Sequence, residues 1–246
     1  MPRLGTRKLY YLLQQQQPEL ARGIGRDWLF RFLQQQGLLV RKKKKYMRTT
    51  DSGGWTRQYP DHVKNNKPCQ PEQHWVADIT YLATRKGYRF LHLLSDAYSK
   101  KIVGYKLSTD MSAASTLQAL QAALAGRSYD RPIIHHSDRG LQYRSSVYTN
   151  LLKQSGMTIS MTQDGSPYDN AVAERINGIL KQEYGLGEQI RDDKTLAVTV
   201  KQAINSYNYQ RPHLSCWMLT PHQMHQQSSL PLRTWKKTYK NAKINV

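Results

Sequence analysis

The sequence predicts an α/β fold, in which a five-stranded mixed sheet with flanking helices follows a small helical module. Three observations support this: a segment that begins with strands and then alternates helices and strands, a basic amino-terminal segment with helical periodicity, and a stretch rich in Gly, Pro, Asn and Lys between them. A chain of 246 residues can bury a substantial core, as one large domain or two small ones.

The strand-rich segment starts at residue 74. Residues 74–84, 88–99 and 100–108 have the apolar, β-branched and aromatic content of strands, and the short stretches RKG and DAYSK are typical of turns. Because short turns join neighbouring antiparallel strands, these three segments predict a meander.

Beyond the meander, the periodicity alternates. It predicts a helix, a strand, a helix, a strand and two further helices, at 111–127, 132–137, 145–156, 157–162, 169–184 and 194–210. Three hairpin strands followed by this alternation is the element order of a ribonuclease H-like fold. We therefore expect a mixed sheet with helices on its faces.

The amino-terminal segment has two helical patterns, at 6–17 and 25–37, joined by a turn that contains Pro and Gly. The second pattern includes Trp28, Leu29, Phe32 and Leu33 at helical spacing. Two short helices before a lysine run fit a helix-turn-helix DNA reader and a plain helical hairpin equally well. The predicted divisions are a helix-turn-helix-like module at 1–46, a basic linker at 47–72, the core at 73–213 and a basic tail at 214–246.

Charge is the strongest signal in the composition. The chain carries 37 Lys and Arg against 17 Asp and Glu, a formal net charge of +20, which predicts a polyanionic partner, with nucleic acid the first candidate. Charge alone leaves a ribosomal or membrane-surface protein open. No apolar run is long enough for a membrane span, and two widely separated cysteines argue against a disulfide scaffold and fit a reducing compartment.

Two aspartates occupy positions that favour a functional role. Asp78 lies in the middle of an apolar predicted strand, where a carboxylate costs several kcal/mol to desolvate unless it has a partner. Asp138 follows the strand at 132–137, at the end where ligand sites of open α/β sheets gather. A buried Asp paired with Arg or Lys, and an ordinary turn residue, are the structural alternatives.

Glu174 lies on the predicted helix 169–184. Val172, Ile176 and Ile179 form its apolar stripe, and Glu174 lies on the opposite side, which it shares with Asn170, Asn177 and Lys181. Taken alone, this side of the helix would also fit an ordinary solvated face.

The combination of these acids resembles a known family. Asp138 lies 60 positions after Asp78 and 36 before Glu174, so 35 residues separate the last two. With the surrounding motifs, the chain resembles the DDE transposases of bacterial insertion sequences, of the second-reading-frame type with a retroviral-integrase-like catalytic core. The resemblance covers about residues 72–222, and its segments are WVADITYL, SDAYSKKIVGY, HHSDRGLQY, SPYDNAVAERINGILKQEY, and YNYQRPH followed by TP.

The resemblance implies that Asp78, Asp138 and Glu174 bind two Mg²⁺ or Mn²⁺ ions, which agrees with the preference of hard cations for oxygen ligands. It implies a transposase that hydrolyses phosphodiesters at transposon ends and transfers the 3′-OH into target DNA. Lys181 is then expected to contact DNA phosphate, and Asn170 and Asn177 are further candidates.

The resemblance extends to IGRDWLFRFLQQQGLLVRKKKK, which looks like the family's helix-turn-helix segment and favours DNA binding there. Arg26, Arg31 and the lysines Lys42, Lys43, Lys44 and Lys45 are the candidates for phosphate contact. The expected partners are transposon-end and target DNA and further copies of the chain, without a membrane. The expected location is the bacterial cytoplasm, in association with the nucleoid.

Rival interpretations remain. A catalytically silent DNA-binding remnant would share the charge, and a ribonuclease acting on RNA–DNA hybrids would share the fold, although the basic module and the 35-residue spacing favour transposition. A tyrosine recombinase would leave the acid triad unexplained. Asp96, Asp164 and Asp169 are expected in turns and caps, and His135 and His136 point in opposite directions on a strand, so they cannot chelate one ion together. The stretch LSCWML at 214–219 is bulkier than the family's usual turn.

Overall fold

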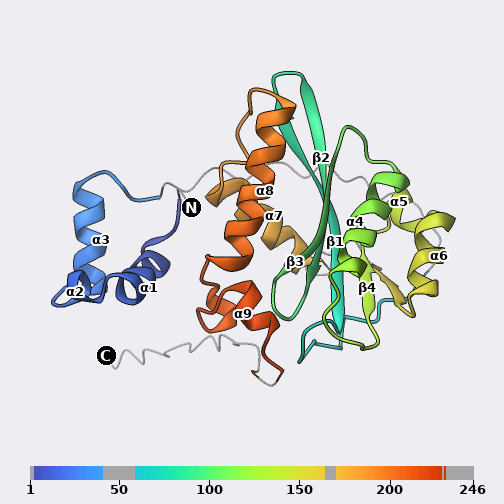
Figure 1. The fold of residues 1–246 in the computed structure, drawn as a ribbon, viewed down its shortest axis with the longest axis horizontal. Helices are drawn as coiled ribbons and strands as arrows, with labels where there is room; N and C mark the ends of the chain where they lie inside the picture. Colours follow the sequence, from blue (N-terminus) through green and yellow to red (C-terminus); the bar gives the residue numbers. More distant parts are fainter. Residues whose placement is uncertain (1–2, 41–58, 164–169, 229, 231–246) are drawn as a thin grey trace, which may run out of the picture.

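The structure is a computed structural model that describes residues 3–40, 59–163, 170–228 and 230. Within these ranges, five strands form one mixed sheet in the order β3-β2-β1-β4-β5 (Figure 1). The predicted ribonuclease H-like arrangement is confirmed, with a meander followed by alternating helices and strands. The strands are β1 (His74–Thr84), β2 (Gly87–Asp96), β3 (Ile102–Ser108), β4 (Ile134–Ser137) and β5 (Thr158–Met161).

The two halves of the sheet differ in strand direction. β1, β2 and β3 pair antiparallel, whereas β4 and β5 run parallel to β1. The pairing of β1 with β4 is short, since it joins only 74–76 to 134–136. β1 therefore continues past the end of β4, and its second half pairs with β2 alone among the named strands.

Helices cover both faces of the sheet (Figure 1). α4 (Ala113–Ala125), α5 (Leu141–Arg144) and α6 (Ser146–Gln154) lie on one face, and α7 (Ala171–Glu183) and α8 (Asp193–Tyr209) lie on the other. The helix starts follow from local chemistry, because the side chains of Ser112, Ser145 and Asp192 each accept a hydrogen bond from a backbone N–H of the first turn.

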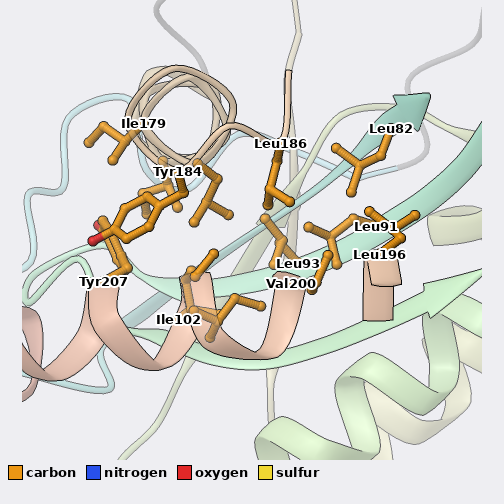
Figure 2. Close-up of a cluster of buried hydrophobic side chains, with 14 residues drawn as sticks. Leu82, Leu91, Leu93, Ile102, Ile179, Tyr184, Leu186, Leu196, Val200 and Tyr207 are labelled. Atoms are coloured by element: carbon orange, nitrogen blue, oxygen red, sulfur yellow. The ribbon is translucent and has the colours of Figure 1, made fainter. Parts of the chain in front are cut away.

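One core lies between the sheet and the helices α7 and α8 (Figure 2). The apolar stripe predicted for the helix 169–184 packs here, with Ile176 and Ile179 buried against the sheet and Val172 half-buried beside them. This core holds α7 at a fixed rotation about its axis. Its remaining members include Leu82, Leu91, Leu93, Ile102, Leu180, Tyr184, Leu186, Leu196, Val200 and Tyr207.

A second core lies between the other face and the helices α4 to α6. Trp75 and Leu120 are fully buried there, together with Tyr148 and Leu152 of α6. α4 approaches β3 so closely that a Cβ on Gly104 would lie 2.4 Å from the carbonyl oxygen of Ala119. A residue without a side chain is therefore required where the helix crosses the strand.

The amino-terminal module contains α1 (Thr6–Gln16), α2 (Pro18–Ala21) and α3 (Arg26–Gln35). α1 and α3 match the two helical patterns, and the turn predicted between them includes the short α2. The apolar stripe of α3 is less buried than its pattern indicates: Leu29 is buried, whereas Trp28 and Phe32 stack on each other at 5.3 Å and remain exposed. An apolar periodicity identifies one side of a helix without identifying what covers it.

Ion pairs connect this module to α7. Glu183, the last residue of α7, accepts hydrogen bonds from Arg211 at 2.7 and 2.8 Å and from Lys8 of α1 at 2.9 Å. Arg211 is 1% exposed and Lys8 is 9% exposed, so these charges are largely withdrawn from water. Arg211 comes from the RPH motif, and the structure gives that motif the role of neutralising Glu183.

The segment 214–246, predicted as a basic tail, begins with η1 (Leu214–Cys216) and α9 (Pro221–His225). Cys216 and Met224 are fully buried against Tyr98, so this first part is built into the core, and residues 231–246 lie outside the described ranges. The bulky LSCWML stretch makes a tight turn, with Trp217 and Met218 both in the left-handed region. The limits of the four predicted domains stay predictions.

α9 also closes a buried polar cluster. Its His225 lies 3.3 Å from Glu72 through Nε2 and 2.9 Å from the Ser99 hydroxyl through Nδ1. Asp96 accepts hydrogen bonds from the backbone and hydroxyl of Ser99, which is the turn role expected for it. Cys69 and Cys216 are free thiols. No helix in the described part of the chain is long and apolar enough to cross a membrane.

Candidate active site

Asp78 lies in β1, and Asp138 directly follows β4, the parallel neighbour of β1. β1 pairs with β4 through Val76 and His136, and each aspartate lies two residues beyond its member of that pair. Neighbouring strands are about 4.8 Å apart, and residues two apart on a strand share a face. The strand register therefore brings the two carboxylates together on the face that α7 covers.

Asp78 is half-buried and has two donors. Its Oδ2 accepts a 2.7 Å hydrogen bond from Nδ2 of Asn177, and its Oδ1 accepts one from the backbone N–H of Ile79. Burial raises the pKa of Asp78 to about 7, and the negative charges of Asp138 and Glu174 add to this rise, while the two hydrogen bonds oppose it. Asp138 and Glu174 are thus close enough for their charges to act on Asp78.

Asp138 follows the last residue of β4 and starts the loop to α5. Its Oδ1 accepts a hydrogen bond from the backbone N–H of Gly140 at 2.9 Å. Burial raises the pKa of the carboxyl group, and the Gly140 N–H and the positive charge of Arg139 oppose the rise. Asp138 therefore ends the strand, as a turn residue would, and at the same time presents its carboxylate beside Asp78.

Glu174 lies on an exposed part of α7, one turn before Asn177. The predicted polar side of this helix is divided. Glu174 is exposed, whereas Asn170 and Asn177 are buried and donate to Ala77 O and to Asp78 on β1. The Oδ1 atoms of both asparagines are buried without a hydrogen-bond partner among the described residues. The expectation that these asparagines contact DNA phosphate stays untested.

Of the remaining predicted contact residues, Lys181 lies near Asp78, Arg26 and Arg31 belong to the amino-terminal module, and the others lie outside the described residues. Lys181 of α7 extends to β1, where its Nζ lies 4.5 Å from the centre of the Tyr81 ring. Arg26 and Arg31 are exposed on α3, where both contact Asp27. The lysines Lys42, Lys43, Lys44 and Lys45 and the aspartates Asp164 and Asp169 lie outside the described residues.

The chain is similar to known proteins over most of its length. Residues 68–167 match the family model described as "Integrase core domain", and residues 155–221 match a second model of the same description. A protein of insertion element IS600 from Shigella sonnei is 35% identical over 88% of this chain and 79% of its own length. A putative transposase of IS986/IS6110 from Mycobacterium tuberculosis is 30% identical over the same shares.

The chain belongs to the insertion-sequence transposases. Its function is DNA transposition, and as an enzyme it is a polynucleotidyl transferase of the DDE type. Nothing in these relatives favours a catalytically silent remnant.

Solved structures support the fold of this transposase. The HTLV-2 integrase catalytic core in complex with magnesium matches 63% of this chain and 97% of its own, at 19% identity and a TM-score of 0.51. The integrase chain of a simian T-cell lymphotropic virus intasome matches 95% of this chain and 79% of its own, at 19% identity and a TM-score of 0.55. The sheet and its helices therefore have the architecture of retroviral integrase cores.

The donor chemistry of the transposase site fits a hard divalent cation. The cluster presents carboxylate oxygens, and the two buried amide oxygens that lack partners are of the same hard type. Burial, followed by the negative charges of Asp138 and Glu174, raises the pKa of Asp78, and a dication would relieve the repulsion between these charges. Within the described ranges, no three His, Cys, Asp or Glu side chains gather closely enough to form a preassembled metal cluster.

The two histidines of the motif HHSDRGLQY are buried beside Asp138 and connect β4 to its neighbours. The two side chains point to different elements, as expected: His135 contacts the Tyr148 hydroxyl of α6 at 2.8 Å, and His136 contacts the Ser160 hydroxyl of β5 at 2.8 Å. Both are fully buried, and burial lowers the pKa of His135 to about 3, which keeps that ring neutral. The hydrogen bond that Asn177 donates to Asp78 was not predicted from the sequence. The feature that could have indicated it is an amide side chain one helical turn after Glu174.

Proposed function

We propose that Asp78, Asp138 and Glu174 are the catalytic acids of this transposase and together hold two Mg²⁺ or Mn²⁺ ions. The observation that supports this most directly is the strand register: Asp78 and Asp138 each follow a paired residue of β1 and β4, Val76 and His136, by two positions, and Glu174 lies on α7, which covers that face of the sheet. The magnesium bound to the HTLV-2 integrase core is a further support.

Such ions supply, when bound, Lewis-acid activation of a water molecule and of the leaving 3′ oxygen. The chain's own residues position the acids: Asn177 fixes one oxygen of Asp78, and the backbone N–H of Gly140 fixes one oxygen of Asp138. Hydrolysis at the transposon end leaves a free 3′-OH. In strand transfer, that oxygen forms a new bond to phosphorus as a bond in the target strand breaks, so one phosphodiester replaces another without an energy source.

DNA is the proposed partner at two places. Lys181 lies beside the acids and would bind a phosphate near the cleaved end, while the exposed Arg26 and Arg31 of α3 would bind phosphates through the amino-terminal module. The net charge of +20 supports a polyanionic ligand. Because two transposon ends must be joined to one target, a homo-oligomer on DNA is part of the proposal.

Substitution of Glu174 tests the assignment. Glu174→Gln keeps the size of the side chain and removes its charge. We expect it to abolish Mg²⁺- or Mn²⁺-dependent cleavage and strand transfer on duplexes of the element's terminal repeat, with DNA affinity unchanged. The matched control is Asp130→Asn, which neutralises an exposed acid. Asp130 precedes β4, whereas Asp138 follows it. Cleavage that survives in Glu174→Gln would show that the acid is assigned wrongly.

A further inference from the structure

Two exposed tyrosines lie on the hairpin of β1 and β2, beyond Asp78 along β1. Tyr81 follows Asp78 by three residues on β1, and Tyr88 is the second residue of the return strand β2. Tyr81 is opposite Phe90, and Tyr88 is opposite Ala83, which makes the two tyrosines diagonal neighbours on one side of the hairpin. Their ring centres are 5.6 Å apart at an interplanar angle of 80°, and they are 42% and 61% exposed.

Tyr81 lies on the part of β1 that extends past β4. Since β4 pairs with β1 only as far as Val76, β1 has no parallel partner among the named strands at Tyr81. Tyr81 and Asp78 belong to alternate sides of β1, and Lys181 spans this open edge from α7, with its ammonium 4.5 Å from the Tyr81 ring centre. Lys181 therefore links the Tyr81 ring to α7, the helix that carries Glu174.

The charge of the hairpin favours an anionic ligand near these rings. From Ile79 to Ser95 the sequence contains no acidic residue and three cations, Arg85, Lys86 and Arg89, of which Arg89 is paired with Asp193 of α8. Arg85 and Lys86 are exposed in the turn of the hairpin, which projects at the top of the view in Figure 1. Exposed aromatic rings among cations are the features with which proteins bind unpaired nucleotides, because rings stack on bases and cations bind phosphates.

We propose that Tyr81 and Tyr88 form a stacking platform for an unpaired nucleobase at the DNA end, and that Lys181 binds the phosphate of that end. A paired base inside a duplex hides its faces, so a platform of this kind selects DNA whose terminal base pairs are open. The platform would hold the terminal nucleotides apart while the scissile phosphate lies at the acids. This inference rests on the proposed active site.

The test compares two duplexes of the element's terminal repeat, one fully paired and one with two mismatched terminal pairs, in EDTA so that no chemistry occurs. We expect the wild type to bind the mismatched end about tenfold more tightly, which is the size of one base–aromatic stack. The double variant Tyr81→Leu, Tyr88→Leu should lose this preference and keep its affinity for the paired end. The matched control, Tyr81→Phe with Tyr88→Phe, keeps both rings and should keep the preference.

The outcomes separate the platform from the active site. A preference that persists in the leucine variant overturns the platform, whereas cleavage that persists in Glu174→Gln overturns the acid assignment and leaves the binding result intact. Cross-linking of a terminal 5-iododeoxyuridine to Tyr81 or Tyr88 would support stacking directly. If the leucine variant instead changes the sedimentation of the DNA-free protein, the tyrosines form an interface between copies and the platform is rejected.

Discussion

Replacing Glu183 with Gln should destabilise the protein strongly, because Glu183 neutralises two cations that are largely buried. Its carboxylate accepts hydrogen bonds from Arg211 at 2.7 and 2.8 Å and from Lys8 at 2.9 Å. The amide of Gln can accept from one cation but carries no charge. Arg211, at 1% exposure, would keep its charge in a site with little water, since a guanidinium does not lose its proton in proteins.

The size of the effect follows from burial. Removing one partner of a buried ion pair costs about 3–5 kcal/mol, because the other charge remains desolvated. Arg211 is 1% exposed and Lys8 is 9% exposed, so the more deeply buried Arg211 accounts for most of the cost. We expect a loss of about 3–4 kcal/mol in the free energy of unfolding at pH 7. For a chain of this size, this corresponds to a melting temperature lower by about 6–16 °C.

Urea denaturation measures this loss, and its pH dependence tests the cause. Burial acts to raise the pKa of Glu183, but the hydrogen bonds and charges of Arg211 and Lys8 outweigh it and lower the pKa below its usual 4.5. A lowered folded-state pKa gives stability that is present above the unfolded value and is lost as the pH falls through the folded one. The wild type and Glu183→Gln should therefore converge in stability at acid pH.

The control is Asp193→Asn, which breaks a 2.7 Å ion pair with Arg89 in which Asp193 is half exposed. Surface pairs of this type contribute less than about 1 kcal/mol. Two results would refute the reasoning: a loss in Glu183→Gln no larger than in Asp193→Asn, or a difference from the wild type that is the same at pH 7 and at acid pH.

Two further predictions concern the core and the buried cluster at α9. Gly104→Ala should cost about 1–3 kcal/mol in urea denaturation, because its Cβ would lie 2.4 Å from a carbonyl oxygen. Gly178→Ala should not destabilise the protein, because no atom lies within 4 Å of a Cβ there. Equal effects of the two substitutions would contradict this. Burial lowers the pKa of His225, but Asp96 and Glu72 outweigh it and raise the pKa above 6.5. The stability of wild type over His225→Gln should therefore be greatest below pH 6.5 and fall as the pH rises through the raised pKa; a difference that does not change between pH 6 and pH 9 would contradict this.

The strands and helices of the core could be predicted because each of them packs an apolar side against a neighbour, which leaves a periodic pattern in the sequence. The strand 74–84 has the predicted limits, and the helix predicted at 194–210 is observed at Asp193–Tyr209. The amino-terminal module was harder. Its helices were predicted, but Trp28 and Phe32 are exposed, because the pattern of a helix carries no information on which neighbour, if any, covers it.

For the site, the residue types and spacing pointed to Asp78, Asp138 and Glu174. Their proximity required the register between β1 and β4, which no local pattern specifies. The sequence places Asn177 on the polar side of its helix with Glu174, as a candidate for DNA contact, and does not show that its amide donates to Asp78. A small rotation of α7 about its axis decides whether such a residue faces water or β1, and that rotation is set by Ile176, Ile179 and the rest of the core on the sheet.

Most of the thirteen residues of α7 have a structural or functional contact, so few of its positions should tolerate substitution. Its apolar residues fix the rotation, Asn177 supports Asp78, Lys181 crosses to Tyr81, and Glu183 accepts the charge of Arg211 and Lys8. A typical surface helix tolerates replacement over most of its outer half. In a scan of all single substitutions, α7 should instead show tolerated positions only as isolated gaps such as Gly178, and an insertion of one residue should disable folding and transposition together.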